Sequence, residues 1–183
     1  MHNLEQLVLQ MLHELKIDVF DENFLETPRR VAAMLLEFHQ PFDPQTLLRD
    51  GFSLANYSGM VTQKNIPFVG MCAHHLLPMY GRAAIGYVPH KRVLGLSKLT
   101  RLVRAIGHET PSLQETLTDR IADILWQHLE PKGVIVVIDA EHSCMSARGV
   151  KALGVITVTS SLRGIYRDVP QAREEFFNLI KYR

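Results

Sequence analysis

The sequence is poor in the features that mark membrane, secreted and nucleic-acid-binding proteins. No apolar run approaches the roughly 20 residues needed to span a bilayer, so we expect no membrane partner. The first residues lack a basic segment followed by an apolar stretch, which predicts no signal peptide. Basic and acidic residues nearly balance, at 20 and 19, so the charge gives no reason to expect nucleic acid as a partner.

Cysteine is also scarce. Cys72 and Cys144 are the only two in the sequence, too few for a disulfide scaffold. We expect a cytoplasmic protein in which both thiols stay reduced and are free for metal binding or catalysis.

The 183 residues are 46% hydrophobic and 21% charged, which is typical of one soluble globular domain. We expect a single domain over 1–183, with N-terminal helices over 1–40 and a core over 60–183. Apolar spacing predicts an amphipathic helix within the first twenty residues. A second helix is predicted at Thr27-Pro28, with Thr27 as its N-cap, and 39–60 is expected to be a connection.

Beyond residue 60 the pattern alternates between hairpins and helices. Strands are predicted at Ile66–Cys72, Arg82–Val88, 134–138 and 156–159. Helices are predicted from Gly95 to a break at 107–111, from about Ser112 to Leu129, and over 170–181. This order predicts an α+β domain with an antiparallel sheet.

The sharpest chemical feature is Cys72-Ala73-His74-His75, with a second cluster at His142-Ser143-Cys144. A thiolate and an imidazole three residues apart suit half of a zinc site, and one distant Cys would complete a three-ligand set with an open position. An open position suits catalysis, because zinc lowers the pKa of bound water toward neutrality. Taken alone, the pattern is more typical of a buried free thiol beside surface histidines. Beside a metal, His74 and His142 would be natural proton carriers.

A second group of residues is basic. Arg and Lys near a helix start, supported by backbone N–H groups, suit a polyphosphate. The candidates are Ser97, Lys98, Arg101, Arg148 and the pair Arg29-Arg30. Any one of these bases alone is better explained as part of a solvated helix surface.

Gln114-Glu115 has two interpretations that spacing cannot separate. In one, Glu115 accepts from the N–H groups of a guanine edge. In the other, Ser112 and Glu115 form a capping box at the start of a helix.

Together these motifs resemble the signature of the GTP cyclohydrolase I family. In chain order they are Thr27-Pro28-x-Arg30-Val31-Ala32, Cys72-Ala73-His74-His75-Leu76-Leu77-Pro78, Gly95-Leu96-Ser97-Lys98-Leu99-x-Arg101, Gln114-Glu115-x-Leu117-Thr118, His142-Ser143-Cys144-Met145-x-Ala147-Arg148-Gly149 and Arg173-Glu174-x-Phe176. The match runs in order from about residue 20 to the C-terminus, which chance would hardly produce.

The resemblance implies a role for each of these residues. Zinc would be held by Cys72, His75 and Cys144, with His74 and His142 as the acid/base pair. Glu115, with Gln114 beside it, would recognise guanine. The triphosphate contacts would be Ser97, Lys98, Arg101, Arg148 and Arg30.

The resemblance also implies an architecture and a reaction. The fold would be the tunnelling fold, an antiparallel sheet with helices on one face, whose pentameric rings form a barrel. The residues over 60–183 would be its catalytic core, and two pentamers would stack into a homodecamer whose active sites are shared between subunits. The reaction would convert GTP to 7,8-dihydroneopterin triphosphate and formate, the first step of pterin and folate biosynthesis.

Three positions depart from the family pattern. Ala73 stands where Glu is usual, and Thr116 stands where Arg generally follows the Gln-Glu pair. The segment from Arg101 to Gln114, which contains residues 107–111, is one residue longer than usual and lacks its common aromatic and Arg residues. None of these changes removes an implied ligand or acid/base group. Two alternatives therefore stay open. One is a diverged relative that acts on another purine nucleotide or stops at the ring-opened intermediate. The other is a non-catalytic tunnelling-fold module with a closed, four-ligand zinc site.

Overall fold

The computed structural model describes residues 3–49, 51–53 and 57–181. The ends of the expected domain, and residues 50 and 54–56 of the expected connection, lie outside the described residues. The elements are α1 (Asn3–Glu14), α2 (Thr27–Glu37), α3 (Pro44–Leu48), β1 (Gly51–Ser53), β2 (Val61–Met71), β3 (Pro78–Val88), β4 (Arg92–Leu94), α4 (Leu96–Glu109), α5 (Gln114–Leu129), β5 (Gly133–His142), α6 (Ser143–Ser146), β6 (Ile156–Gly164), α7 (Ile165–Asp168) and α8 (Pro170–Lys181). Among the described residues, no helix has the length and apolar character that crossing a membrane requires.

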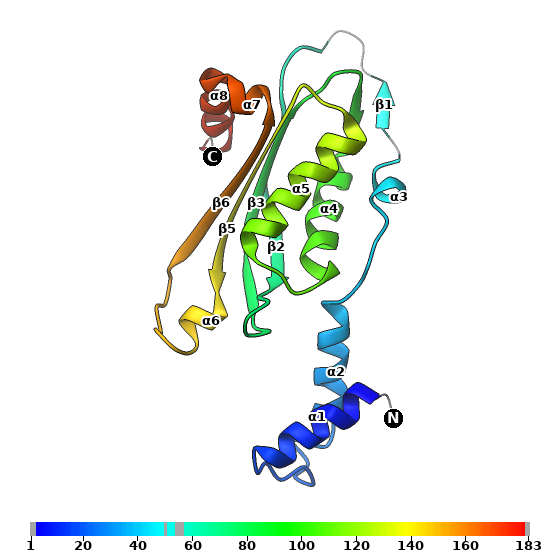
Figure 1. Cartoon of the computed structure of the whole chain (residues 1–183), viewed down its shortest axis with the longest axis vertical. Coiled ribbons are helices and arrows are strands. Elements are labelled where there is room, and N and C mark those ends of the chain that lie inside the picture. The colour runs from blue at the N-terminus through cyan, green and yellow to red at the C-terminus, as the bar shows by residue number, and fades with distance from the viewer. Residues whose placement is uncertain (1–2, 50, 54–56, 182–183) are drawn as a thin grey trace.

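The first two helices pack on each other through a small apolar cluster of their own, centred on Val8, Leu12 and Val19. The predicted N-terminal helix is confirmed as α1. The helix α2 begins at Thr27, but Thr27 is its first residue rather than its cap, and Glu26 precedes it without a side-chain cap. In Figure 1 the pair extends from one end of the sheet as an arm, and we call α1 and α2 the arm below.

The expected connection over 39–60 contains two short elements that apolar spacing did not reveal. Asp43 caps α3, because its carboxylate accepts from the backbone N–H groups of Gln45 and Thr46. The strand β1 pairs with β4 in a separate two-stranded sheet. Elements of three to five residues show too few repeats for periodicity to detect them.

The main sheet has four antiparallel strands in the order β2-β3-β5-β6, so the expected α+β class is confirmed. The predicted strands are present but each is longer. The strand β2 begins at Val61 rather than Ile66. Its pairing with β3 shifts register between Gln63 and Ile66, and this bulge hides the first part of the strand from the sequence pattern. Such a bulge interrupts the alternation of buried and exposed residues on which the prediction relied.

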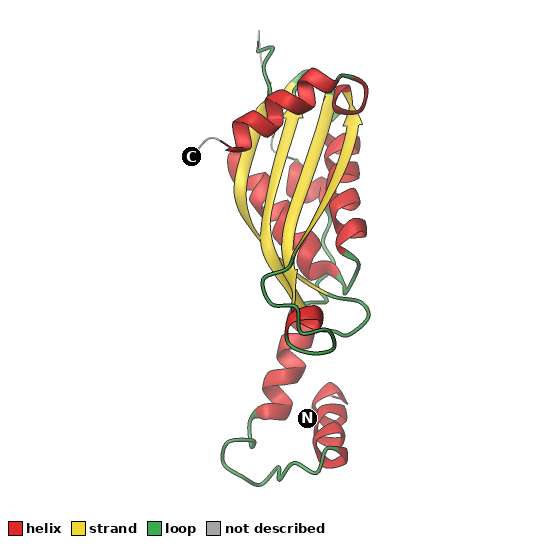
Figure 2. Ribbon diagram, turned by 90° about the vertical axis from the view of Figure 1, so that its left-hand side faces the viewer, coloured by secondary structure: helices red, strands yellow, loops and turns green. Residues whose placement is uncertain are grey.

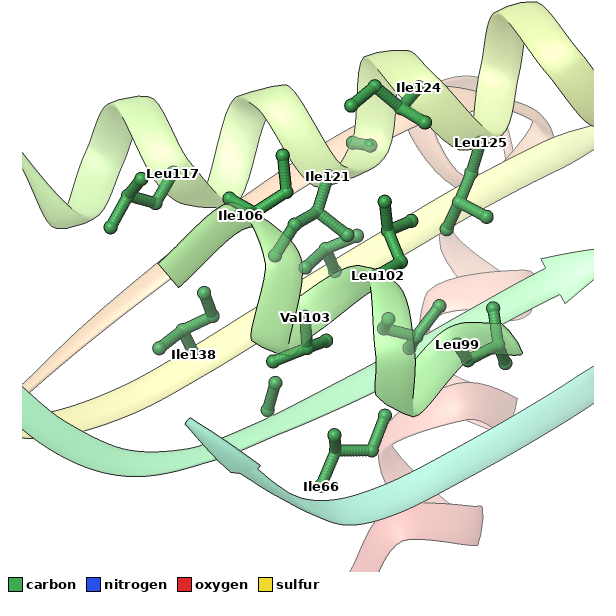
Figure 3. Packing of buried hydrophobic residues seen from close by; sticks show 14 of the residues in the cluster. Ile66, Leu99, Leu102, Val103, Ile106, Leu117, Ile121, Ile124, Leu125 and Ile138 are labelled. Carbon is green, nitrogen blue, oxygen red and sulfur yellow. The ribbon is translucent and has the colours of Figure 1, made fainter. Parts of the chain in front are cut away.

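The helices α4 and α5 cover one face of this sheet and bury the main core (Figure 3). Leu102, Val103 and Ile106 of α4 are fully buried there, as is Ile121 of α5. The break predicted at 107–111 falls too early, because α4 continues to Glu109. Gly107 lies where α4 passes closest to β2, which is why this position has no side chain.

The opposite face of the sheet is only partly covered. Figure 2 shows α8 lying across one end of that face, an addition to the helices that the resemblance placed on one side. Tyr166 of α7 and Phe176 of α8 are fully buried, in a cluster with Val88 and Ile135 of the sheet. Towards the other end of the strands, Tyr80 and Val158 on this face stay exposed in the single chain.

A charged network fastens the edge strand β6 to α5. The Nη2 atom of Arg163 lies 2.7 Å from Oδ1 of both Asp119 and Asp123. Ser161 donates a hydrogen bond of 2.6 Å to Asp119. The Ser161 hydrogen bond, and then those from Arg163, lower the pKa of Asp119, so its carboxylate stays charged and holds the network together.

Gly107→Ala is expected to destabilise the fold, although alanine is the better helix former by about 1 kcal/mol. The added Cβ would lie 2.0 Å from the carbonyl oxygen of Val69, so α4 would have to move away from β2. Overpacking of this kind typically costs about 1–3 kcal/mol, which chemical unfolding measures. Gly95→Ala is the matched control, because its Cβ would meet nothing nearer than 3.7 Å. A Gly107→Ala protein as stable as the parent chain would contradict this packing.

Candidate active site

Three neighbouring strands of the main sheet bring the cysteine and histidine motifs to one end. Cys72 follows β2, and the turn that leads into β3 carries His74 and His75. Cys144 lies in α6, which directly follows β5. Because β3 lies between β2 and β5, the β2–β3 turn and α6 leave the sheet side by side, at the lower end in Figure 1.

Cys72, His75 and Cys144 form what we call the Cys–His–Cys group. Their ligand atoms all lie within 4.8 Å of one another. The two Sγ atoms are 4.0 Å apart, and Cys72 is buried while Cys144 is half-buried. Two thiols and one imidazole at this spacing fit a metal ion with a preference for soft ligands.

The turn that carries Cys72 and His75 is held by backbone hydrogen bonds at both sides. Within the turn, Cys72 N donates to Leu77 O at 2.9 Å and Leu76 N donates to Cys72 O at 2.9 Å. On the outside, Ser112 N donates to Met71 O at 2.9 Å, and Ala73 N donates to Ser112 O at 3.2 Å. The second pair ties the turn to the start of α5, so α5 and the Cys–His–Cys group keep a fixed relation.

The two further histidines lie beside this group. His74 Nδ1 is 3.9 Å from Cys72 Sγ. His142 ends β5, and its Nε2 is 2.7 Å from Oε1 of Gln114 at the start of α5. His74 therefore lies at the Cys–His–Cys group, and the side chain of His142 is held at the start of α5.

Burial affects the Cys144 thiol of the group. Desolvation, and then the neighbouring Cys72, raises the pKa of the Cys144 thiol above its ordinary value. Metal ligands must be thiolates, so metal binding at this pair would release protons.

Arg148 also reaches the group, where its guanidinium contacts the ring of His75. Its Nη1 is 3.1 Å from Nε2 of His75. A guanidinium can only donate, so Nε2 of His75 accepts in this hydrogen bond.

The capping-box interpretation of Glu115 is wrong. The N-cap of α5 is Leu113, and no side chain caps the helix. Ser112 lies one position too early, because its backbone pairs with the turn after β2. The exposed Glu115 instead lines a groove of about 550 Å³ with Thr116, Asp119, Thr159 and Ser160.

Gln114 does not have the exposed side chain that a direct guanine contact needs. It is 1% exposed, and its amide nitrogen and its amide oxygen both have partners within the chain. The resemblance placed Gln114 beside Glu115 at the ligand, whereas the structure places its side chain against His142.

The remaining basic residues lie away from the Cys–His–Cys group in this chain. Ser97, Lys98 and Arg101 lie in the first turns of α4, whereas the other end of α4 approaches the group. The distance from Ser97 to Glu109 is about 18 Å at a rise of about 1.5 Å per residue. Arg30 lies on the arm. The candidate triphosphate contacts are therefore not gathered within one chain, except for Arg148.

Sequence reasoning missed several polar residues near these candidates. Arg101 lines a pocket of about 450 Å³ with Arg104 and His108, and its spacing from Arg104 could have indicated this, since residues three apart share a helix face. Thr118 and Thr159 contact Gln114. Thr118 follows Gln114 by one helical turn, which is a usable signal, but nothing in the sequence points to Thr159.

Comparison with known proteins gives a consistent result. A profile of the family described as GTP cyclohydrolase I matches residues 4–181. A GTP cyclohydrolase 1 of Hydrogenobaculum sp. (strain Y04AAS1) is 51% identical over 164 residues, covering 90% of this chain and 88% of the relative. That of Aquifex aeolicus (strain VF5) is 47% identical over 178 residues, covering 97% and 95%. That of Bacillus subtilis (strain 168) is 42% identical over 181 residues, covering 97% and 94%.

Cys144→Ser is expected to lose most of the metal that the protein binds, because the Cys–His–Cys group would keep only one thiolate. Metal content per chain, measured by mass spectrometry after purification in the presence of zinc, checks this. Ser143→Ala, next to Cys144 in α6, is the matched control and should keep its metal. Full occupancy in Cys144→Ser would rule out this group as the metal site.

Proposed function

Since the chain belongs to the GTP cyclohydrolase I family, we propose that it converts GTP to 7,8-dihydroneopterin triphosphate and formate. The observation that carries the proposal is the Cys–His–Cys group, with His74 and His142 beside it. The curated relatives that share most of this chain are named GTP cyclohydrolase 1, which supports GTP as the substrate. The cytoplasm suits such a site, because both cysteines must stay reduced to bind a metal.

Zinc is the proposed metal at Cys72, His75 and Cys144. Two thiolates and one imidazole are a typical donor set for zinc, and three protein ligands are the number found at catalytic zinc sites. Zinc bound there would supply Lewis acidity, which makes water nucleophilic near neutral pH.

His74 and His142 are proposed to move the protons that ring opening and reclosure require. His74 Nδ1 lies 3.9 Å from Cys72 Sγ, and His142 directly precedes α6, which carries Cys144. Histidine is the side chain best suited to exchange protons near neutral pH. A positioned acid or base of this kind typically accelerates the chemical step by about 100- to 10,000-fold.

Glu115 is proposed to select guanine. Its carboxylate is exposed in the groove between α5 and β6, with no cap to form. It could accept from the ring N–H and the amino group of guanine, a pair of donors that neither adenine nor xanthine offers in full. A buried polar edge left unpaired costs about 1–3 kcal/mol, which is the expected basis of discrimination.

The triphosphate is proposed to be bound by residues of more than one subunit. Arg148 lies beside the Cys–His–Cys group, whereas Ser97, Lys98 and Arg101 lie towards the far end of α4. Arg30 lies on the arm, outside the sheet and the helices that cover it. A second copy of the chain would bring these bases to the site and complete it.

We propose a homodecamer of two stacked pentamers as the active assembly. Among the described residues, β2 and β6 each pair on one side only, so each leaves an open edge that a neighbouring copy could extend. The partly uncovered face of the sheet and the exposed apolar residues of the arm, Leu7 and Met11 among them, are further surfaces that an assembly would bury. The family resemblance supplies the ring geometry.

Zinc-loaded protein incubated with GTP is expected to release formate and a product that becomes a fluorescent pterin on oxidation. His142→Ala should keep its zinc and bind GTP, but slow the chemical step by about 100- to 10,000-fold.

Glu115→Ala should lower GTP affinity by about 1–3 kcal/mol and leave the melting temperature unchanged, because its carboxylate caps nothing. Glu174→Ala, an exposed carboxylate on α8, is the control for loss of charge. Unaltered GTP affinity in Glu115→Ala would remove guanine recognition from this residue, and no formate from the parent protein would end the proposal.

Shared sites can be tested by mixing two inactive variants. Light scattering should give a mass near ten times 20.8 kDa. Subunits with Arg101→Ala and subunits with Cys144→Ser, dissociated and reassembled together, should recover part of the activity, because some sites receive one intact half from each variant. Mixing His142→Ala with Cys144→Ser is the control and should recover none, since both residues belong to the same end of one chain. An active monomer, or no recovery in the first mixture, would contradict sharing.

A further inference from the structure

The side chain of Gln114 is one of the few buried polar groups in the described residues, and it is completely used. Its Nε2 lies 3.0 Å from Ile138 O, 3.1 Å from Thr157 O and 3.0 Å from Thr159 Oγ1. Its Oε1 lies 2.7 Å from Nε2 of His142. A carboxamide has two N–H donors and one carbonyl oxygen, so the three acceptors around Nε2 share its two hydrogens, and Oε1 accepts from His142.

These partners fix which way the amide faces. The carbonyl oxygens of Ile138 and Thr157 can only accept, so the amide nitrogen must face them and the amide oxygen must face His142. Turning the amide over would set oxygen against two oxygens in a buried site, at the cost of both hydrogen bonds.

The orientation of the amide determines the protonation pattern of His142. Since Oε1 of Gln114 can only accept, Nε2 of His142 must be the donor and must carry a hydrogen. In the neutral imidazole the hydrogen is then on Nε2, and the lone pair is on Nδ1.

Two threonines hold Gln114 in place from the other side. The hydroxyl of Thr118 donates to the backbone oxygen of Gln114 at 2.7 Å. Its single hydrogen is then used, so in the 2.6 Å contact between the two hydroxyls Thr159 is the donor. Thr159 has a lone pair left to accept from Gln114 Nε2. Donation therefore runs in one direction, from His142 through Gln114 and Thr159 to Thr118.

We infer that Gln114 is a positioning residue that holds the His142 ring in one orientation, with Nε2 as the hydrogen-bond donor to Oε1 of Gln114. The inference rests on the proposed function for the catalytic role of His142, but the protonation pattern itself does not. It replaces a direct contact between Gln114 and guanine, for which the buried side chain has no free polar atom.

The protonation pattern can be read without turnover. In zinc-loaded protein labelled with ¹⁵N histidine, solid-state NMR distinguishes a protonated from an unprotonated ring nitrogen at any assembly size. The signals of His142 are those absent from His142→Gln. We expect a protonated Nε2 and an unprotonated Nδ1 in the parent protein, and a mixture of both forms in Gln114→Met. A parent protein with the hydrogen on Nδ1 would overturn the inference even if GTP turnover is as proposed.

Kinetics then separate positioning from guanine binding. Gln114→Met should lower kcat by about 10- to 100-fold, the usual loss when a supporting hydrogen bond is removed, and leave KM for GTP unchanged. In a His142→Ala background the same substitution should cost nothing further, because Gln114 would act only through His142. Gln127→Met on the exposed side of α5 is the matched control and should leave both constants unchanged.

If Gln114→Met does not fold, Gln114→Asn carries the same tests, because it keeps an amide that is too short to span the site. A raised KM with kcat retained, or an equal loss in the His142→Ala background, would overturn the inference.

Discussion

The arrangement of the candidate site depends on the antiparallel register between β3 and β5. Met79 lies opposite His142 in this pairing, and Pro78 lies opposite Met71 in the pairing of β3 with β2. The β2–β3 turn and α6 consequently leave the sheet at the same end, with their thiols in contact range. A slip of one residue would turn His142 to the other face of the sheet. The alternate residues of β5 that are buried under α4 and α5 prevent it, because a slip would expose them.

The start of α5 is the second fixed point of the site, and it links the sheet to the chemistry. Gln114 contacts two strands at once, because Ile138 and Thr159 are opposite each other in the pairing of β5 with β6. Burying a carboxamide without partners costs several kcal/mol by transfer scales, so its presence is tolerated only where both strands supply acceptors. The edge strand β6 supplies Thr157 and Thr159, and the Arg163 network holds that strand against α5. Residues remote from the Cys–His–Cys group thus contribute to the position of His142.

The parts of the fold that the sequence predicts best are those in which one pattern repeats many times. The amphipathic spacing in α1 and the apolar run at 134–138 each indicate one structure, and both are present. The capping box failed because Ser112 pairs with the β2–β3 turn, a contact between segments far apart in sequence. For the same reason the ligand set is a weak signal without the family resemblance. The sequence also does not predict the hydrogen bond from His142 to Gln114. Its existence depends on the lateral order of the strands, which residue spacing does not contain.

The hydrogen bond between Arg148 and His75 connects the metal group to the proposed triphosphate site. A neutral imidazole has one lone pair, and here Arg148 uses the lone pair on Nε2, so Nδ1 carries the hydrogen. His75 is a candidate metal ligand and Arg148 is a candidate triphosphate contact, so this hydrogen bond places the two proposed sites side by side in one chain.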